Sequence, residues 1–171
     1  SIAWFDPAGV WTINTSILDN SNANGSLYES WNLSETLAFN MGRELIFPSV
    51  NVGQLNVTAS NNITMNNTGN QAVTANNTNV TAYDLVGATN NAFSIAAKNF
   101  TIGLTSTPCS ATEMVNGSTR AVGGSLPVGN FTAGNGKEEF WSCLIRVDQS
   151  LIQQTYTSTA TGATNWQVAM S

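Results

Sequence analysis

Apolar and polar residues alternate with a period of two along most of the chain. Successive side chains of a strand point to opposite faces of a sheet, so this period predicts strands with one buried face. Few segments carry helical spacing for ten residues. The apolar positions of the predicted strands are Trp31, Leu33, Leu37, Phe39 and Met41; Val50 and Val52; Leu55 and Val57; Phe93, Ile95 and Ala97; Phe100, Ile102 and Leu104; Trp141, Cys143, Ile145 and Val147; and Trp166, Val168 and Met170.

Clusters of Gly, Asn and Ser separate these runs at 20–25, 87–91, 123–124 and 134–136, and they predict turns. Short strands between turns favour an all-β fold, an antiparallel immunoglobulin-like β-sandwich with Greek-key connections, over alternating strands and helices. The length of 171 residues suits one domain with its own core.

The first eighteen residues form an apolar tail, which a polar stretch follows at 19–26. We therefore predict a tail at 1–18, a linker at 19–26 and a sandwich head at 27–171. Two interpretations of the tail remain open. It is the first strand of its own sheet, or it is donated to the sheet of a neighbouring subunit, which produces a head-to-tail polymer. The predicted interface residues are Ile2, Trp4, Val10, Trp11, Ile13, Thr15 and Ile17.

Eleven Asn-x-Ser/Thr acceptor triplets occur in the chain. Roughly five would arise by chance at this content of Asn, Ser and Thr, so the excess is about twofold. Such triplets are N-glycosylated only outside the cytosol, and we expect an extracellular chain on which covalent glycans occupy some sites. The candidates are Asn14, Asn24, Asn32, Asn56, Asn62, Asn66, Asn76, Asn79, Asn99, Asn116 and Asn130.

Charged residues make up 9% of the chain, against about 25% in an ordinary soluble domain. The surface must therefore be built from hydroxyl groups, amides and sugars. With five Lys and Arg and a net charge of -5, the chain has little with which to neutralise a phosphate backbone, so we expect no nucleic-acid partner. No apolar stretch approaches the length of a membrane span, and the beginning of the chain lacks the regions of a signal peptide, which indicates a mature chain.

Cys109 and Cys143 are the only cysteines. In an extracellular chain they most simply form one structural disulfide. A metal site or a catalytic cysteine would need further Cys or His partners, and the chain has no His. We predict no metal and no cofactor apart from the glycans.

The segment 56–81 alternates Asn and Thr with small apolar residues and holds five of the acceptor triplets. We interpret it as low-complexity strand and loop sequence in which sugars protect exposed strand faces and edges.

The residue types of the chain give little support for a catalytic site. Without His there is no His-containing triad and no His-ligated metal, and the carboxylates available for glycoside hydrolysis are Glu113, Glu138, Glu139 and Asp148. We predict that the chain is not an enzyme. An Asn–Lys isopeptide bond at Lys98 or Lys137 is a further hypothesis, and it requires a buried lysine.

Two alternatives to a head-to-tail polymer also remain open. A secreted glycan-binding module would stack sugars on Trp4, Trp31, Trp141 or Trp166. A surface-layer component would assemble into sheets instead of fibres.

In its organisation the whole chain resembles the subunit of the archaeal thread, a glycosylated crenarchaeal cell-surface filament. The resemblance rests on the apolar tail 2–18, the linker 19–26, the Asn/Thr-rich sandwich with its acceptor sites, and the cysteine pair. It implies a pilin-like sandwich and an extracellular homopolymer joined by donor-strand complementation, as in chaperone-usher pilins. It also implies a role in adhesion and surface networks, with the tail as the donor strand. We expect surface glycans or neighbouring cells as the adhesion targets.

Overall fold

The fold is all-β, as the sequence predicted. The computed structural model describes residues 3, 5–42, 44–129 and 136–171. Within these residues every pair of strands is antiparallel. The strands are β1 (Gly9–Leu18), β2 (Asn24–Leu33), β3 (Phe39–Met41), β4 (Leu55–Thr58), β5 (Ile63–Asn67), β6 (Thr78–Thr81), β7 (Leu85–Gly87), β8 (Ser94–Ile95), β9 (Phe100–Gly103), β10 (Thr112–Glu113), β11 (Thr119–Ala121), β12 (Lys137–Arg146), β13 (Tyr156–Thr157) and β14 (Gln167–Met170), with 3₁₀ helices η1 (Ala97–Asn99) and η2 (Pro108–Ser110).

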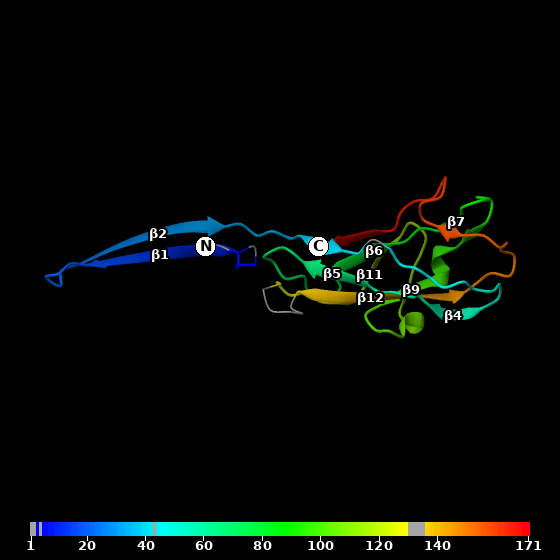
Figure 1. Cartoon of the computed structure of the whole chain (residues 1–171), viewed down its shortest axis with the longest axis horizontal. Coiled ribbons are helices and arrows are strands. Elements are labelled where there is room, and N and C mark those ends of the chain that lie inside the picture. Colours follow the sequence, from blue (N-terminus) through cyan, green and yellow to red (C-terminus); the bar gives the residue numbers. More distant parts are fainter. Residues whose placement is uncertain (1–2, 4, 43, 130–135) are drawn as a thin grey trace.

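The molecule has two parts, an N-terminal ribbon and a head (Figure 1). β1 and β2 pair with each other in a two-stranded sheet, and the ribbon projects from one end of the head. The head contains a sheet in the order β10-β9-β12-β5-β3, to which β4 adds beside β12, and smaller sheets in the orders β11-β6-β14 and β13-β7-β8.

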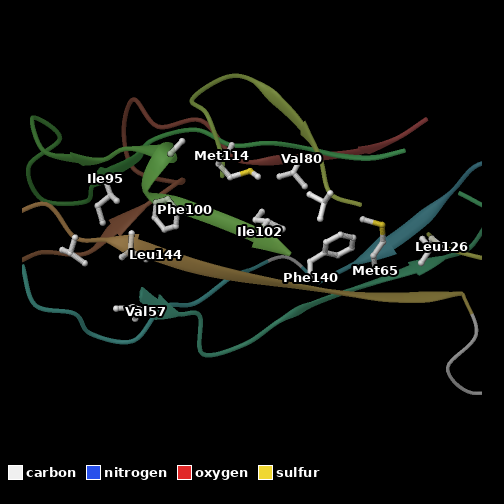
Figure 2. Packing of buried hydrophobic residues seen from close by; sticks show 14 of the residues in the cluster. Val57, Met65, Val80, Ile95, Phe100, Ile102, Met114, Leu126, Phe140 and Leu144 are labelled. Atoms are coloured by element: carbon white, nitrogen blue, oxygen red, sulfur yellow. The ribbon is translucent and has the colours of Figure 1, made fainter. Parts of the chain in front are cut away.

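β12 organises the head because three strands pair with it. Its first half pairs with β5, its second half pairs with β4, and β9 pairs with its centre. Its alternating residues Phe140 and Leu144 are buried in the core, where they meet residues of β5, β6 and β9 such as Met65, Val80 and Phe100. Figure 2 shows these side chains filling the space between the strands.

The Asn/Thr-rich middle of the chain differs from its interpretation as exposed strand and loop. β5 and β6 are interior strands, each paired on both sides, and their residues Met65 and Val80 are core residues. Asn67 is also buried, and its Nδ2 donates to the carbonyl oxygens of Gln71, Leu126 and Pro127. The amide side chain thus links β5 to two other backbone segments, at Gln71 and at 126–127, so polarity here reflects hydrogen bonding inside the fold.

The predicted strand with apolar positions from Trp31 to Met41 is split in two. Trp31 and Leu33 belong to β2 in the ribbon, whereas Phe39 and Met41 belong to β3 in the head. The connector 34–38 is held by Asn70, whose Oδ1 accepts from the Thr36 N–H (2.7 Å) and whose Nδ2 donates to the Ser34 carbonyl (3.0 Å).

Gly69 allows the same connector to pass close to the head. A Cβ at Gly69 would lie 2.1 Å from the carbonyl oxygen of Thr36, so no other residue fits without a shift of the backbone. This close approach and the Asn70 hydrogen bonds attach the root of the ribbon to the head.

The predicted disulfide is confirmed. Cys109 of η2 bonds to Cys143 of β12, and Cys143 is fully buried. The bridge ties η2 to the central strand of the large sheet.

Loss of this disulfide should destabilise the head. Closing a loop of about 35 residues stabilises a fold by about 3.8 kcal/mol in the chain-entropy model. We therefore expect the Cys109→Ala/Cys143→Ala double variant to lose about 3–4 kcal/mol in denaturant unfolding without reductant. With reductant present, both proteins lack the bond in the unfolded state and the difference should largely disappear. A stability difference that persists with reductant would show that the substitutions act through packing and not through loss of the disulfide.

Candidate assembly surface and glycan acceptor sites

The ribbon pairs in one unbroken register over its full length. Ten residues of β1 face ten of β2, from Gly9–Leu33 at the root to Leu18–Asn24 at the tip. Directly paired residues share one face of a sheet, so odd-numbered residues lie on one face and even-numbered residues on the other. We call these the odd face and the even face of the ribbon.

The tip of the ribbon is a turn that side-chain and backbone hydrogen bonds hold in place. The Asp19 Oδ1 accepts from the N–H groups of Ser21 (2.7 Å) and Ala23 (2.8 Å), and the Asp19 N–H donates to the Ala23 carbonyl (3.0 Å). Asn22 takes a positive φ of 61°, a conformation that Asn tolerates better than most residues. Residues 19–23 therefore close a hairpin.

This hairpin corrects the predicted division into tail, linker and head. Residues 19–26 include the turn and the start of β2, and residues 27–33 belong to the ribbon. β1 is neither a single extended tail nor a strand of the head's sheets. The turn predicted at 20–25 is present, and what the sequence interpretation missed is that it joins two paired strands: Asp, Asn and Ser between two apolar-alternating segments are typical of a hairpin turn.

The ribbon has an apolar odd face. Of the predicted interface residues, Trp11, Ile13, Thr15 and Ile17 lie on it, Val10 lies on the even face, and Ile2 and Trp4 lie outside the described residues. The sequence interpretation missed the contribution of β2, namely Leu27, Trp31 and Leu33. Trp11 and Trp31 are direct partners with ring centroids 6.4 Å apart, and Ile13, Ile17 and Leu27 are each more than half exposed.

The head exposes fewer large apolar side chains than the ribbon. Two of them, Val52 and Leu55, lie at the start of β4 and in the turn before it, and β4 is at the end of the head opposite the ribbon (Figure 1). Val57 of the same strand is buried, whereas Leu55, two residues before it and opposite Arg146, is exposed. β4 has β12 as its one strand partner in the described sheets, which leaves its other edge for a further strand.

The structure separates the acceptor asparagines by accessibility. Asn99 is 3% exposed, and its Nδ2 donates to the Asp148 Oδ2 (3.1 Å). Two exposed acceptors, Asn56 and Asn76, have positive φ, so part of the Asn content serves backbone conformation. Exposed acceptors are Asn14, Asn24, Asn32, Asn56, Asn76 and Asn116; half-buried ones are Asn62, Asn66 and Asn79; and Asn130 lies outside the described residues.

The tryptophans proposed for sugar stacking do not form one platform. Trp166 packs edge-on against the core residue Phe100, and its Nε1 donates to the Tyr83 carbonyl (2.7 Å). Trp31 lies in the ribbon and Trp141 is half-buried on β12, while Trp4 lies outside the described residues.

The candidate catalytic carboxylates are also dispersed. Glu138 is half-buried and Glu139 is exposed, as expected for neighbours on a strand; Glu113 is exposed on β10, and Asp148 bonds to Asn99 and Arg146. Among the described residues, no three His, Cys, Asp or Glu side chains could hold a metal ion.

The isopeptide hypothesis requires a buried lysine, and both candidates, Lys98 and Lys137, are exposed. None of the helices that the structure describes is long and apolar enough to cross a bilayer.

Comparison of the chain with family models, with curated proteins and with solved structures finds no match.

We expect Asn99 to carry no glycan. A sugar on its Nδ2 would break the hydrogen bond to Asp148 and would need space that the buried side chain lacks. Glycopeptide mass spectrometry of the native protein should find Asn99 bare, with the exposed Asn76 and Asn116 as comparison sites. A glycan on Asn99 of the folded chain would contradict this placement.

Glu138 should make the fold more stable in acid. Burial raises the pKa of its carboxyl group above the ordinary value of 4.5. Because the folded-state pKa is raised, this contribution to stability is fully present below pH 4.5 and is lost as the pH rises through the raised pKa.

The Glu138→Gln variant should therefore be more stable than the parent at neutral pH, and it should lose the part of the acid stabilisation that Glu138 supplies. Thermal unfolding between pH 4 and pH 8 would measure this difference. Glu139→Gln removes the same charge from an exposed position on the same strand and is the matched control. If the unfolding temperatures of the parent and of Glu138→Gln change with pH in parallel, Glu138 does not contribute to the stability in acid.

Proposed function

We propose that this chain is the structural subunit of an extracellular, N-glycosylated cell-surface filament, in which the N-terminal ribbon of one subunit binds the head of the next. The observation that carries the proposal is the ribbon itself. It is a ten-pair hairpin that projects from the head with an apolar face to which the head contributes no strand.

A ribbon of this kind needs a partner. An isolated two-stranded hairpin is marginally stable in water, and a large exposed apolar patch is typical of an interaction site. Of the eleven large apolar side chains found exposed among the described residues, six lie on the ribbon: Val10, Ile13, Ile17, Leu18, Leu27 and Tyr28.

The polarity of the molecule favours a chain of subunits over a closed pair. The ribbon lies at one end, and Val52 and Leu55 are exposed at the opposite end. Contact between two different surfaces is heterologous, and it extends indefinitely when the rotation between subunits does not close a ring.

Strand donation is the interaction that fits these elements. The edge strands β3, β4 and β14 each lack a second strand partner in the described sheets, so they leave main-chain groups for a donated strand. Backbone hydrogen bonds would supply affinity, and the apolar side chains of the ribbon would supply specificity. This is donor-strand complementation with a hairpin as the donor.

An extracellular location is consistent with the composition. The disulfide, the exposed acceptor asparagines and the low content of charged residues suit a protein that functions outside the cell. Filaments of this kind would connect surfaces through adhesion to surface glycans or neighbouring cells.

The proposal is tested by removing the whole ribbon. We expect electron microscopy and light scattering to show fibres for the full chain and folded monomers for a chain that starts at residue 34. Cutting after Leu33 avoids leaving β2 unpaired, which a cut after Leu18 would do. A synthetic peptide of residues 1–33 should bind the shortened chain one to one and raise its unfolding temperature.

Two results would reject the filament. One is a full-length chain that stays monomeric at high concentration, and the other is a shortened chain that polymerises as well as the parent. The retained disulfide and unchanged circular dichroism serve as controls that the head has folded.

A further inference from the structure

The two faces of the ribbon differ in where the acceptor asparagines lie. Asn14, Asn24 and Asn32 are all even-numbered, so all three lie on the even face, and all three are exposed. The odd face of the paired strands contains no acceptor asparagine. The register of the hairpin produces this separation.

On the even face, each acceptor lies directly opposite a large apolar residue. Asn14 pairs with Tyr28, Asn24 pairs with Leu18, and Asn32 pairs with Val10. Directly paired side chains in an antiparallel sheet have their Cβ atoms about 4.5–5.5 Å apart. The first sugar on each asparagine would therefore lie beside its apolar partner, and at Tyr28 a sugar ring has an aromatic face to stack on.

These three apolar residues are the large ones of the even face. Glycans at the three acceptors would thus shield that face completely from protein partners. The odd face would keep Trp11, Trp31, Ile13, Ile17, Leu27 and Leu33 uncovered, with Glu29 as its one charged residue.

We propose that the ribbon is a two-faced connector: glycans at Asn14, Asn24 and Asn32 cover its even face, and its odd face docks, as an intact hairpin, on the head of a second copy of this chain. This inference rests on the proposed filament function and deepens it, because it names the face that binds, the face that is modified and the surface that receives the ribbon.

A second ribbon is too small to be the occupant on its own. Ten residues span about 33 Å, and two strands are about 10 Å wide, so the odd face covers about 330 Å². Two ribbons lapped face to face would bury on the order of 700 Å², below the roughly 1,200 Å² of a stable specific interface. A head adds a further contact, because the hairpin can pair its edge with an edge strand such as β4 while its odd face packs against the head.

The head offers that surface at β4. Val52 and Leu55 are exposed there, and the strand has an edge without a partner in the described sheets. This end of the head lies opposite the ribbon, so docking there propagates the chain in one direction (Figure 1).

The hairpin docks intact because its strands satisfy each other's backbone groups. All ten residues of β1 are paired to β2, and the Asp19 side chain closes the turn between them. Releasing β1 as a single strand would break this ladder and would leave both edges of β2 unpaired.

The experiment compares matched substitutions on the two faces of β1 in the full glycosylated chain. Ile13→Ser/Ile17→Ser removes two aliphatic side chains from the odd face, where they are 53% and 70% exposed. Val10→Ser/Leu18→Ser removes two from the even face, where they are 77% and 64% exposed. Neither pair creates or removes an acceptor triplet.

The odd-face pair should raise the critical concentration for polymerisation by at least about a hundredfold, and the even-face pair should change it by less than about threefold. Light scattering measures the critical concentration of each variant. Thermal unfolding of the head is the control for folding. Equal effects of the two pairs, or a larger effect of the even-face pair, would overturn the assignment of the docking face while leaving the filament itself intact.

The receiving surface is tested by complementation. A chain with Val52→Ser/Leu55→Ser keeps its ribbon but loses the proposed docking site. Mixed with the Ile13→Ser/Ile17→Ser chain, it should form one-to-one heterodimers that grow no further, since each chain then has one working surface. Filaments from the Val52→Ser/Leu55→Ser chain alone, or closed dimers of the parent chain, would contradict the proposal that the ribbon docks on this surface of a second head.

The glycan face is tested by mass spectrometry and by Asn14→Gln/Asn24→Gln/Asn32→Gln. All three sites should be occupied in the native protein, and the triple variant should still polymerise but associate laterally through Val10, Leu18 and Tyr28. A bare site among the three, or a triple variant that assembles as poorly as the odd-face pair, would overturn the role of the sugars. A parent chain that forms no polymer at all would instead reject the filament function.

Discussion

The interaction on which the architecture depends is the pairing of β1 with β2. By taking the next strand as its partner, the N-terminal strand forms a separate ribbon and leaves the sheets of the head to form without it. Because side chains alternate with a period of two, a slip of one residue would pair Trp11, Ile13 and Ile17 with even-numbered residues of β2. The residues that now form two separate faces would then be mixed. The hydrogen bonds of Asp19 at the tip and the Trp11–Trp31 contact near the root hold this register from both ends.

The attachment of the ribbon is as specific as its register. Asn70 hydrogen-bonds the connector at Ser34 and Thr36, and Gly69 lets the Thr36 carbonyl approach more closely than any side chain would permit. These contacts fix the connector between the ribbon and the head. The disulfide between η2 and β12 fixes a second irregular segment to the central strand of the large sheet.

The head shows how a chain with few charges builds a core and a surface. Buried amides such as Asn67 satisfy backbone groups from within, and the buried Asn99 donates a hydrogen bond to Asp148. The same residue type therefore has three uses here: a hydrogen-bonding group in the core, a left-handed backbone position at Asn56 and Asn76, and an exposed acceptor on the ribbon. Composition alone does not distinguish them, because all three draw on the same amide chemistry.

Local information was sufficient for part of this protein. The period-two alternation predicted the all-β class and the strands that became β9, β12 and β14, and two cysteines in a chain of extracellular composition predicted their bond. The sequence by itself also determined where acceptor triplets lie along the chain. The tertiary structure alone decided which strand partners which: that residues 24–33 join the tail in a ribbon, that the Asn/Thr-rich β5 and β6 are interior strands, and that Asn99 is buried. The physical reason is that alternation specifies that a strand has two faces, whereas only its pairing and register specify what each face meets.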